Sequence, residues 1–195
     1  MLVPEAFYQR NDVTRIARDL IGKALFTRLD RKVTAGMIVE TEAYSWKEKG
    51  CHAYNNRKTA RNAVMFGEGG VAYVYLCYGM YNLFNVVTNR EGQADAVLIR
   101  ALEPLEGVKY MKERTGAEHE KRITSGPGKL TRALGIDRQH NGVALSSKHV
   151  WLADIGRRVS GQHIVSSPRI GIDYAGEDAL LPWRFTLKSN PWISK

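Results

Sequence analysis

Residues 71–85 (VAYVYLCYGMYNLFN) constrain the fold of this chain more than any other stretch. Tyr73 and Tyr75 alternate with apolar residues, which places both on one face of a pleated strand, and Tyr78 follows at a break beside Gly79. This pattern predicts a β-hairpin with aromatic side chains at its tip. A helix is the alternative, because three of the tyrosines recur every third residue, but the central glycine argues against it.

The tyrosines and the charge of the chain favour the same class of partner. Aromatic rings held on a rigid turn can stack on nucleobases, although any single tyrosine is more often an ordinary core or surface residue. The chain has 29 basic and 20 acidic residues, a net charge of +9, which suits a polyanion such as nucleic acid or an anionic membrane surface. Charge alone does not choose between these partners.

The length and composition predict one globular domain covering residues 1–195. Hydrophobic residues make up 44% and charged residues 25% of the chain, which excludes disordered and fibrous classes. Two cysteines, Cys51 and Cys77, are too few for a disulfide framework or a zinc site, so a reducing compartment is expected. The chain shows no signal peptide and no apolar run of membrane-spanning length, and we expect a soluble, cytoplasmic protein.

Helical and strand patterns mix without a regular βαβ alternation. We therefore predict an α+β fold with a mixed, largely antiparallel sheet, peripheral helices and a protruding tyrosine hairpin. The predicted helices are 13–21, 104–115 and a segment from about 127 to 135. The predicted strands besides the hairpin are 24–29, 36–44, 96–102, 150–153, 169–172 and 183–187, and 116–123 is a candidate mobile loop.

A carboxylate and an arginine stand out within two of these strands. Alternation places Glu40, Glu42 and Tyr44 on one face of strand 36–44. Two interpretations are open: one of the carboxylates is buried at the end of the strand, or this end is a solvated edge. Arg100 interrupts the apolar strand 96–102, and a buried arginine needs a partner. Glu42 is a candidate for that partner.

Two polar segments are candidate anion sites. The loop 48–62 contains His52 and clusters Arg57, Lys58 and Arg61, which form either a solvated face or phosphate contacts. Ser125 and Lys129 stand at the predicted start of a helix, where free backbone N–H groups attract anions. The spacing is not that of a Walker loop, so a nucleotide-triphosphate enzyme is not expected.

Several longer segments together resemble one known family. They are residues 38–44 (IVETEAY), His52, 61–62, 65–66, 73–81 (YVYLCYGMY), Asn85, 98–107 (LIRALEPLEG), 125–130 (SGPGKL), 169–172 and 190–192 (NPW). In this order they resemble the alkyladenine, or 3-methylpurine, DNA glycosylases of the mammalian and bacterial type, and the likeness runs from near residue 10 to the C-terminus.

The resemblance implies a catalytic role for three residues. Glu42 resembles the general base that activates a water to attack C1′ of the deoxyribose. Arg100 and the main-chain carbonyl of Ile170 resemble the groups that help to hold this water.

The resemblance also implies three kinds of DNA contact: with a flipped base, with the duplex stack and with phosphates. Tyr44, His52 and Tyr75 look like walls around a flipped base, Asn85 like the side chain that crowds the 2-amino group of guanine, and Tyr78 like the residue that enters the duplex. Phosphate contacts are implied for Arg57, Arg61, Tyr81, Ser125 and Lys129.

The implied function is that of a monofunctional glycosylase. It would act as a monomer, associated with the nucleoid while acting, on double-stranded DNA with damaged purines of the 3-methyladenine class, and leave an abasic site without a metal or organic cofactor. The alternatives are a non-catalytic damage-sensing binder, which would not need Glu42 beside Arg100, and a glycosylase-lyase, which would need a lysine nucleophile. Lys129 is the only lysine in a recognised motif. The loop 55–62 has Asn-Asn and Ala60 where the family has a glycine-containing loop and a proline, so its rigidity and the lesion preference are open.

Overall fold

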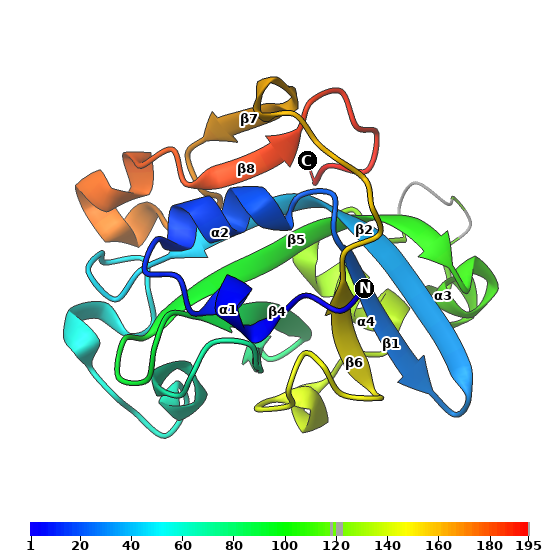
Figure 1. Cartoon of the computed structure of the whole chain (residues 1–195), viewed down its shortest axis with the longest axis horizontal. Coiled ribbons are helices and arrows are strands. Elements are labelled where there is room, and N and C mark those ends of the chain that lie inside the picture. The colour runs from blue at the N-terminus through cyan, green and yellow to red at the C-terminus, as the bar shows by residue number, and fades with distance from the viewer. Residues whose placement is uncertain (118, 120–122, 195) are drawn as a thin grey trace.

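Two long neighbouring strands, β2 (Lys32–Tyr44) and β5 (Asp95–Glu106), form the centre of the molecule (Figure 1). The structure is a computed structural model that describes residues 1–117, 119 and 123–194. The two strands pair antiparallel, with bulges around Glu40 that bend β2 at its middle. They bring Glu40, Glu42 and Arg100 together at the centre of the sheet.

The other strands extend this central pair into an eight-stranded sheet. The path is β3-β4-β5-β2-β1-β6, where β1 is Ala24–Leu29, β3 Ala72–Cys77, β4 Tyr81–Thr88 and β6 Val150–Ala153. β8 (Arg184–Leu187) pairs with the second half of β2, and β7 (Ile164–Ser167) pairs with β8. All strand pairs in the described part of the chain are antiparallel, so the predicted α+β class is confirmed.

Short helices lie around the sheet. They are α1 (Glu5–Tyr8), α2 (Val13–Leu20), α3 (Val108–Thr115) and α4 (Pro127–Leu134), with 3₁₀ segments at Tyr54–Asn56, Ala63–Phe66, Arg138–His140, Gly161–His163 and Asp173–Leu180. Asp12 caps α2 by accepting a hydrogen bond from the backbone N–H of Arg15 at 3.0 Å. α2 packs across β2 and β5, and α4 packs on β4 and α3 (Figure 1). In the described chain no helix is both long and apolar enough to cross a bilayer.

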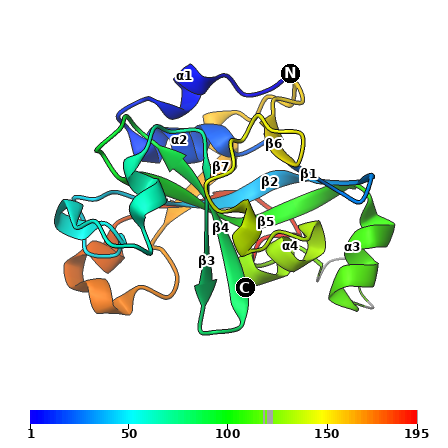
Figure 2. The same cartoon turned by 90° about the horizontal axis from the view of Figure 1, so that it is seen from below.

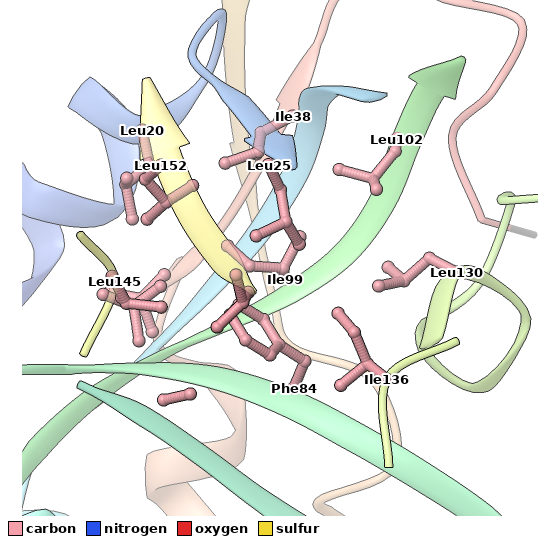
Figure 3. Packing of buried hydrophobic residues seen from close by; sticks show 14 of the residues in the cluster. Leu20, Leu25, Ile38, Phe84, Ile99, Leu102, Leu130, Ile136, Leu145 and Leu152 are labelled. Carbon is pink, nitrogen blue, oxygen red and sulfur yellow. The ribbon is translucent and has the colours of Figure 1, made fainter. Parts of the chain in front are cut away.

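One large apolar cluster holds these elements together. Leu25, Ile38, Phe84 and Ile99 from four strands meet Leu130 of α4 in its centre (Figure 3). Each fully buried side chain of this kind contributes roughly 1.5–3 kcal/mol. The cluster makes the sheet a rigid base for the polar residues on its two central strands.

The tyrosine hairpin of β3 and β4 projects from the body of the molecule (Figure 2). The N–H of Met80 donates to the carbonyl of Cys77 at 3.1 Å, and Tyr78 and Gly79 both have positive φ, 50° and 70°. These values define a type I′ turn, whose twist matches that of the paired strands. The predicted hairpin with Tyr78 at its tip is confirmed.

Two predicted elements differ from the structure. Residues 169–172 were expected to form a strand, but they form a bend, because Arg169 turns inward to a buried partner and Gly171 has a φ of +77°. The helix expected from residue 104 begins at Val108, because β5 continues to Glu106 and only Gly107, with a φ of +70°, ends it.

Other predicted boundaries are close to those observed. β2 begins at Lys32 rather than at residue 36, since its first residues pair with β1 across a tight turn. The predicted mobile loop 116–123 lies partly outside the described residues.

Candidate active site

A cavity of about 710 Å³ opens between the tyrosine hairpin, the loop around His52, the start of α4 and the bend at Ile170. This volume lies within the range of roughly 300–1,000 Å³ that is usual for ligand cavities. Every residue that the sequence predicted for the site lines this cavity, except Glu42, Arg57 and Lys58. Glu42 lies behind the cavity wall, while Arg57 is an exposed residue outside the lining.

Glu42 is fully buried and accepts three hydrogen bonds. Its Oε1 accepts from the backbone N–H of Ile170 at 2.8 Å, and its Oε2 accepts from the Tyr44 hydroxyl at 2.8 Å and from Arg100 Nη1 at 3.3 Å. All three donors line the cavity. A carboxylate has about four acceptor positions, so one position is left for a water.

The contact of Ile170 differs from the one that the sequence predicted. The main-chain carbonyl was expected to hold a water, whereas the structure shows the N–H of the same residue donating to Glu42. The role of the carbonyl stays a prediction. Burial, followed by the charge of Glu42, holds the pKa of Tyr44 well above its ordinary value, so the phenol keeps the proton that it donates to Glu42.

Glu40 is a second fully buried carboxylate on the same strand as Glu42. The alternative that this end of the strand is a solvated edge is therefore wrong. Its Oε1 accepts from Arg100 Nε at 3.0 Å, Arg184 Nε at 2.7 Å and Ser194 Oγ at 2.7 Å, and its Oε2 accepts from the Ser194 N–H at 2.6 Å. Two carboxylates thus face two arginines, and the formal charges cancel.

Arg100 is shared by both carboxylates and stays charged. Burial lowers its pKa, but Glu42 and Glu40 together raise it by more, so the net change is upward. Glu40, Arg184 and Ser194 were missed as site residues. Strand alternation had placed Glu40 on the right face, but no local pattern links it to Ser194, 154 residues later.

Three aromatic rings form one wall of the cavity. The His52 ring lies 4.7 Å from the Tyr75 ring at an angle of 66°, and Tyr75 lies 5.3 Å from Tyr73. The guanidinium of Arg61 lies 5.0 Å from the centre of the Tyr75 ring, so it forms part of this wall. Tyr73, which the sequence had not assigned to the site, contacts His52 Nδ1 through its hydroxyl at 2.9 Å.

The imidazole in this wall is neutral at neutral pH. Burial and, secondarily, the charge of Arg61 lower the pKa of His52 to about 4. The residue nevertheless keeps an exposed surface and lines the cavity. The wall therefore presents π faces and no positive charge from His52.

The mouth of the cavity carries three exposed tyrosines, of which Tyr78 and Tyr174 are the most exposed. Tyr78 at the hairpin tip is 84% exposed, and Tyr174 is 70% exposed. Tyr174 belongs to the 3₁₀ segment Asp173–Leu180, and its hydroxyl donates to the carbonyl of Gly50 at 3.3 Å. The sequence reasoning missed Tyr174, because a lone aromatic after a bend carries no distinguishing pattern.

Asn85 is fixed deep in the cavity, directly opposite Tyr73 in the β3–β4 pair. It is 4% exposed, and its Nδ2 donates to the carbonyl of Tyr73 at 3.1 Å. The side-chain amide of Asn85 is therefore held in one orientation towards any ligand in the cavity.

The start of α4 lies beside the tyrosine hairpin at the mouth of the cavity. Ser125, Lys129 and Tyr81 line it, and the described structure shows no side chain capping the first turn of the helix. Gly128 is required here, because a Cβ at this position would lie 2.8 Å from Tyr81 Cδ1. Free N–H groups and a lysine beside a cavity make a site for an anion.

The loop that differs from the family pattern is well braced. Asn55 and Asn56 have φ values of 55° and 57°, a conformation that asparagine tolerates better than most residues. The buried Asn62 donates from Nδ2 to the carbonyls of His52 at 2.8 Å and Arg57 at 2.9 Å. The loop therefore holds His52 without the expected glycine and proline.

Among the described residues, no three His, Cys, Asp or Glu side chains gather as a metal-binding group. The expectation that no metal is needed stays a prediction.

Comparisons with known proteins agree with this geometry. The profile of the methylpurine-DNA glycosylase family (MPG) matches residues 6–191. A protein of Methanocella arvoryzae is 49% identical over 196 residues, which span 100% of this chain and 96% of the relative. Proteins of Carboxydothermus hydrogenoformans (47% identical, 100% of both chains) and Chlamydia felis (45% identical, 95% of this chain and 96% of the relative) are similar. All three are provisionally named 3-methyladenine DNA glycosylase. The chain therefore belongs to the methylpurine-DNA glycosylase family, whose members are DNA repair enzymes that hydrolyse N-glycosidic bonds.

Proposed function

We propose that this enzyme flips an alkylated or deaminated purine of the 3-methyladenine class out of duplex DNA and hydrolyses its glycosidic bond with a water that Glu42 activates. The observation that carries the proposal is the position of Glu42: a buried carboxylate with three donors, directly behind an aromatic cavity. Such a carboxylate is oriented and dry enough to act as a general base.

The proposed reaction proceeds as follows. The water loses a proton to Glu42 while its oxygen forms a bond to C1′ of the deoxyribose. The bond from C1′ to the base nitrogen breaks, and its electron pair leaves with the base. Arg100, Tyr44 and the Ile170 N–H hold the carboxylate throughout, and the product is an abasic site.

The aromatic wall supports selection of damaged bases. Alkylated purines such as 3-methyladenine are cationic and electron-poor, so they stack favourably on Tyr75, Tyr44 and a neutral His52. Asn85, fixed by its bond to Tyr73, is placed to crowd the 2-amino group of guanine. Shape and stacking then supply the selectivity, and one general base supplies the chemistry.

The residues at the mouth of the cavity support a particular placement of the DNA duplex on the enzyme. Tyr78 would enter the duplex in place of the flipped base, since its ring is exposed on a rigid turn. Ser125, Lys129, Tyr81 and Arg61 would contact phosphates near the flipped nucleotide, and Arg57 would contact them from outside the cavity. The whole chain would act as one domain and as a monomer.

A lyase reaction is the second candidate that chemistry allows, and it needs an amine in the cavity. Of the residues that the structure describes, Lys129 is the one lysine in the lining, and it lies at the mouth rather than beside Glu42. We therefore expect borohydride to trap no covalent protein–DNA product. A trapped band would establish the lyase reaction instead.

The proposal is tested with a panel of duplexes, each bearing one lesion: 3-methyladenine (or a stable analogue), 7-methylguanine, hypoxanthine or ethenoadenine. Incubation with the enzyme followed by alkaline cleavage reveals abasic sites. We expect cleavage at one or more of these lesions and none at the matched undamaged purine. Lesion binding without cleavage would favour the non-catalytic damage sensor.

A further inference from the structure

A second buried ion pair lies beside the candidate general base and is not explained by the reaction. Arg169 and Glu48 are 6% and 3% exposed. Arg169 Nη1 and Nη2 donate to the two carboxylate oxygens of Glu48 at 2.7 and 2.8 Å. This two-pronged pairing fixes the plane of the guanidinium as well as its position.

The same guanidinium also donates to the backbone of two segments that are far apart in the sequence. Nη1 also donates to the carbonyl of Ala43 at 2.9 Å, and Nη2 donates to the carbonyl of Asp178 at 3.0 Å. Its centre lies 4.7 Å from the Tyr44 ring. Arg169 therefore ties the end of β2 to the segment that follows Ile170.

Glu48 is held equally firmly. The N–H of Gly50 donates to its Oε2 at 2.7 Å, and a Cβ on Gly50 would lie 2.9 Å from the same oxygen. Burial lowers the pKa of Arg169, but the hydrogen bonds and charge of Glu48 outweigh this and raise it. Arg169 therefore stays charged where it contacts Glu48.

The pair acts on Glu42 through two of its three donors. Ile170, which follows Arg169 directly, gives its N–H to Glu42, and Tyr44, on which Arg169 stacks, gives its hydroxyl. The side chain of Ile170 is 41% exposed, so its own packing does little to hold that amide.

We propose that Arg169 and Glu48 are positioning residues that hold the Ile170 amide and the Tyr44 hydroxyl on Glu42 and so fix the orientation of the general base behind the cavity wall. This inference rests on the proposed function of Glu42. A merely structural role is a weaker explanation, because a buried ion pair can often be replaced by apolar residues with little loss of stability.

The first test is Arg169→Lys in the full chain, assayed by single-turnover excision on a lesion that the wild type cleaves. Lysine keeps the charge but cannot pair with both oxygens or stack as a plane. We expect a loss of about 100-fold in the maximal rate, the scale of a misplacement of about 1 Å at a reacting centre. The enzyme concentration for half-saturation should change by less than about threefold, because no DNA-contacting group is removed.

The pH profile is the readout that a structural role would not change. A carboxylate that loses a hydrogen-bond donor is protonated more readily, so the acid limb of the excision rate should move to higher pH. Glu48→Gln should move it in the same direction with a smaller loss of rate, since the amide still accepts one hydrogen bond.

Arg114→Lys is the matched control. Arg114 donates to the carbonyl of Ala133 at 2.9 Å and to Thr34 Oγ1 at 3.2 Å, joining α3 to α4 and β2 away from the cavity lining. This variant should lose thermal stability and keep the wild-type rate and acid limb. An equal loss of rate in both variants, or a lower rate with an unmoved acid limb in Arg169→Lys, would overturn the proposal.

A backbone variant covers the case in which Arg169→Lys does not fold. Replacing the amide at residue 170 by an ester exchanges the N–H that donates to Glu42 for an oxygen, weakens the carbonyl of residue 169 as an acceptor, and leaves every side chain unchanged. We expect a slower rate and the same shift of the acid limb, and a wild-type profile would overturn the proposal. Failure of the wild type to cleave any lesion would instead reject the proposed function, and this inference with it.

Discussion

The two sides of the cavity are built in opposite ways. On the β2–β5 side, Glu40 and Glu42 are completely buried and each accepts several hydrogen bonds. On the hairpin side, Tyr78 is 84% exposed and lies on the type I′ turn between β3 and β4. The proposed reaction needs a desolvated and fixed carboxylate, whereas the proposed entry of Tyr78 into a DNA duplex needs a ring that is exposed to solvent. The comparison predicts that changes on the first side reduce the rate, and changes on the second reduce recognition.

The largest expected effect is at the buried side. Glu42→Gln keeps the shape of the side chain but cannot accept a proton, so excision should fall by at least about 100-fold while lesion-DNA binding is retained. Single-turnover excision and a binding titration measure the two effects. The exposed carboxylate Glu106, changed to Gln, should leave both unchanged. A Glu42→Gln rate within about tenfold of wild type would contradict the assignment of the general base.

The hairpin side should show its effect only when the duplex resists flipping. Extruding a paired base costs a few kcal/mol, and recovery of roughly 1.4 kcal/mol by the Tyr78 ring corresponds to about tenfold. Tyr78→Ser should therefore slow excision about tenfold from a well-paired duplex and distinctly less from a mismatch or bubble.

Tyr78→Phe is the control, since it keeps the ring and should excise normally in both contexts. Equal losses for Tyr78→Ser in paired and unpaired DNA would place Tyr78 in the base pocket and remove the contrast between the two sides.

The protonation state of His52, in the aromatic wall of the cavity, can be tested by the pH dependence of stability. Its pKa in the folded protein, about 4, lies below the ordinary value of 6.5, so between these values the unfolded chain binds more protons. The contribution of His52 to stability is therefore fully present above pH 6.5 and is lost as pH falls towards 4. The melting temperature of the wild type should drop more between pH 7 and pH 4.5 than that of His52→Gln. A parallel drop in both proteins would show that the imidazole is not held neutral.

The smallest effect concerns the anion site at α4. If Lys129 neutralises one phosphate, Lys129→Gln should reduce the slope of log affinity against log salt for undamaged duplex by about 0.9. Arg157→Gln, an exposed arginine outside the cavity lining, should leave the slope unchanged. An unaltered slope for Lys129→Gln would remove this residue from the DNA contact.

Local patterns were sufficient for the parts of the site that lie within one hairpin or on one strand. Alternation and Gly79 predict the turn that carries Tyr78, and a charged residue in an apolar strand predicts that Arg100 needs a carboxylate. The family resemblance added roles for these residues. It did not supply the contacts that bring them together.

Contacts between distant segments were not predictable in this way. Arg169 meets Glu48 across 121 residues of chain, and the strand expected at 169–172 is absent because this contact turns the chain inward. Ser194 reaches Glu40 across 154 residues. No spacing rule applies at such separations, since only the folded sheet makes these residues neighbours.

The contact between Ser194 and Glu40 has a consequence for the order of assembly. During synthesis, Glu40, Glu42 and Arg100 are made long before Arg184 and Ser194, which supply three of the four hydrogen bonds that Glu40 accepts. Contacts of such high sequence separation form late in folding, because the entropy cost of closing a long loop comes before the contacts lower the free energy. The strands of the nascent sheet can thus pair while Glu40 still lacks three of its hydrogen bonds. Glu40 therefore gains its full set of hydrogen-bond donors only after residue 194 has been made.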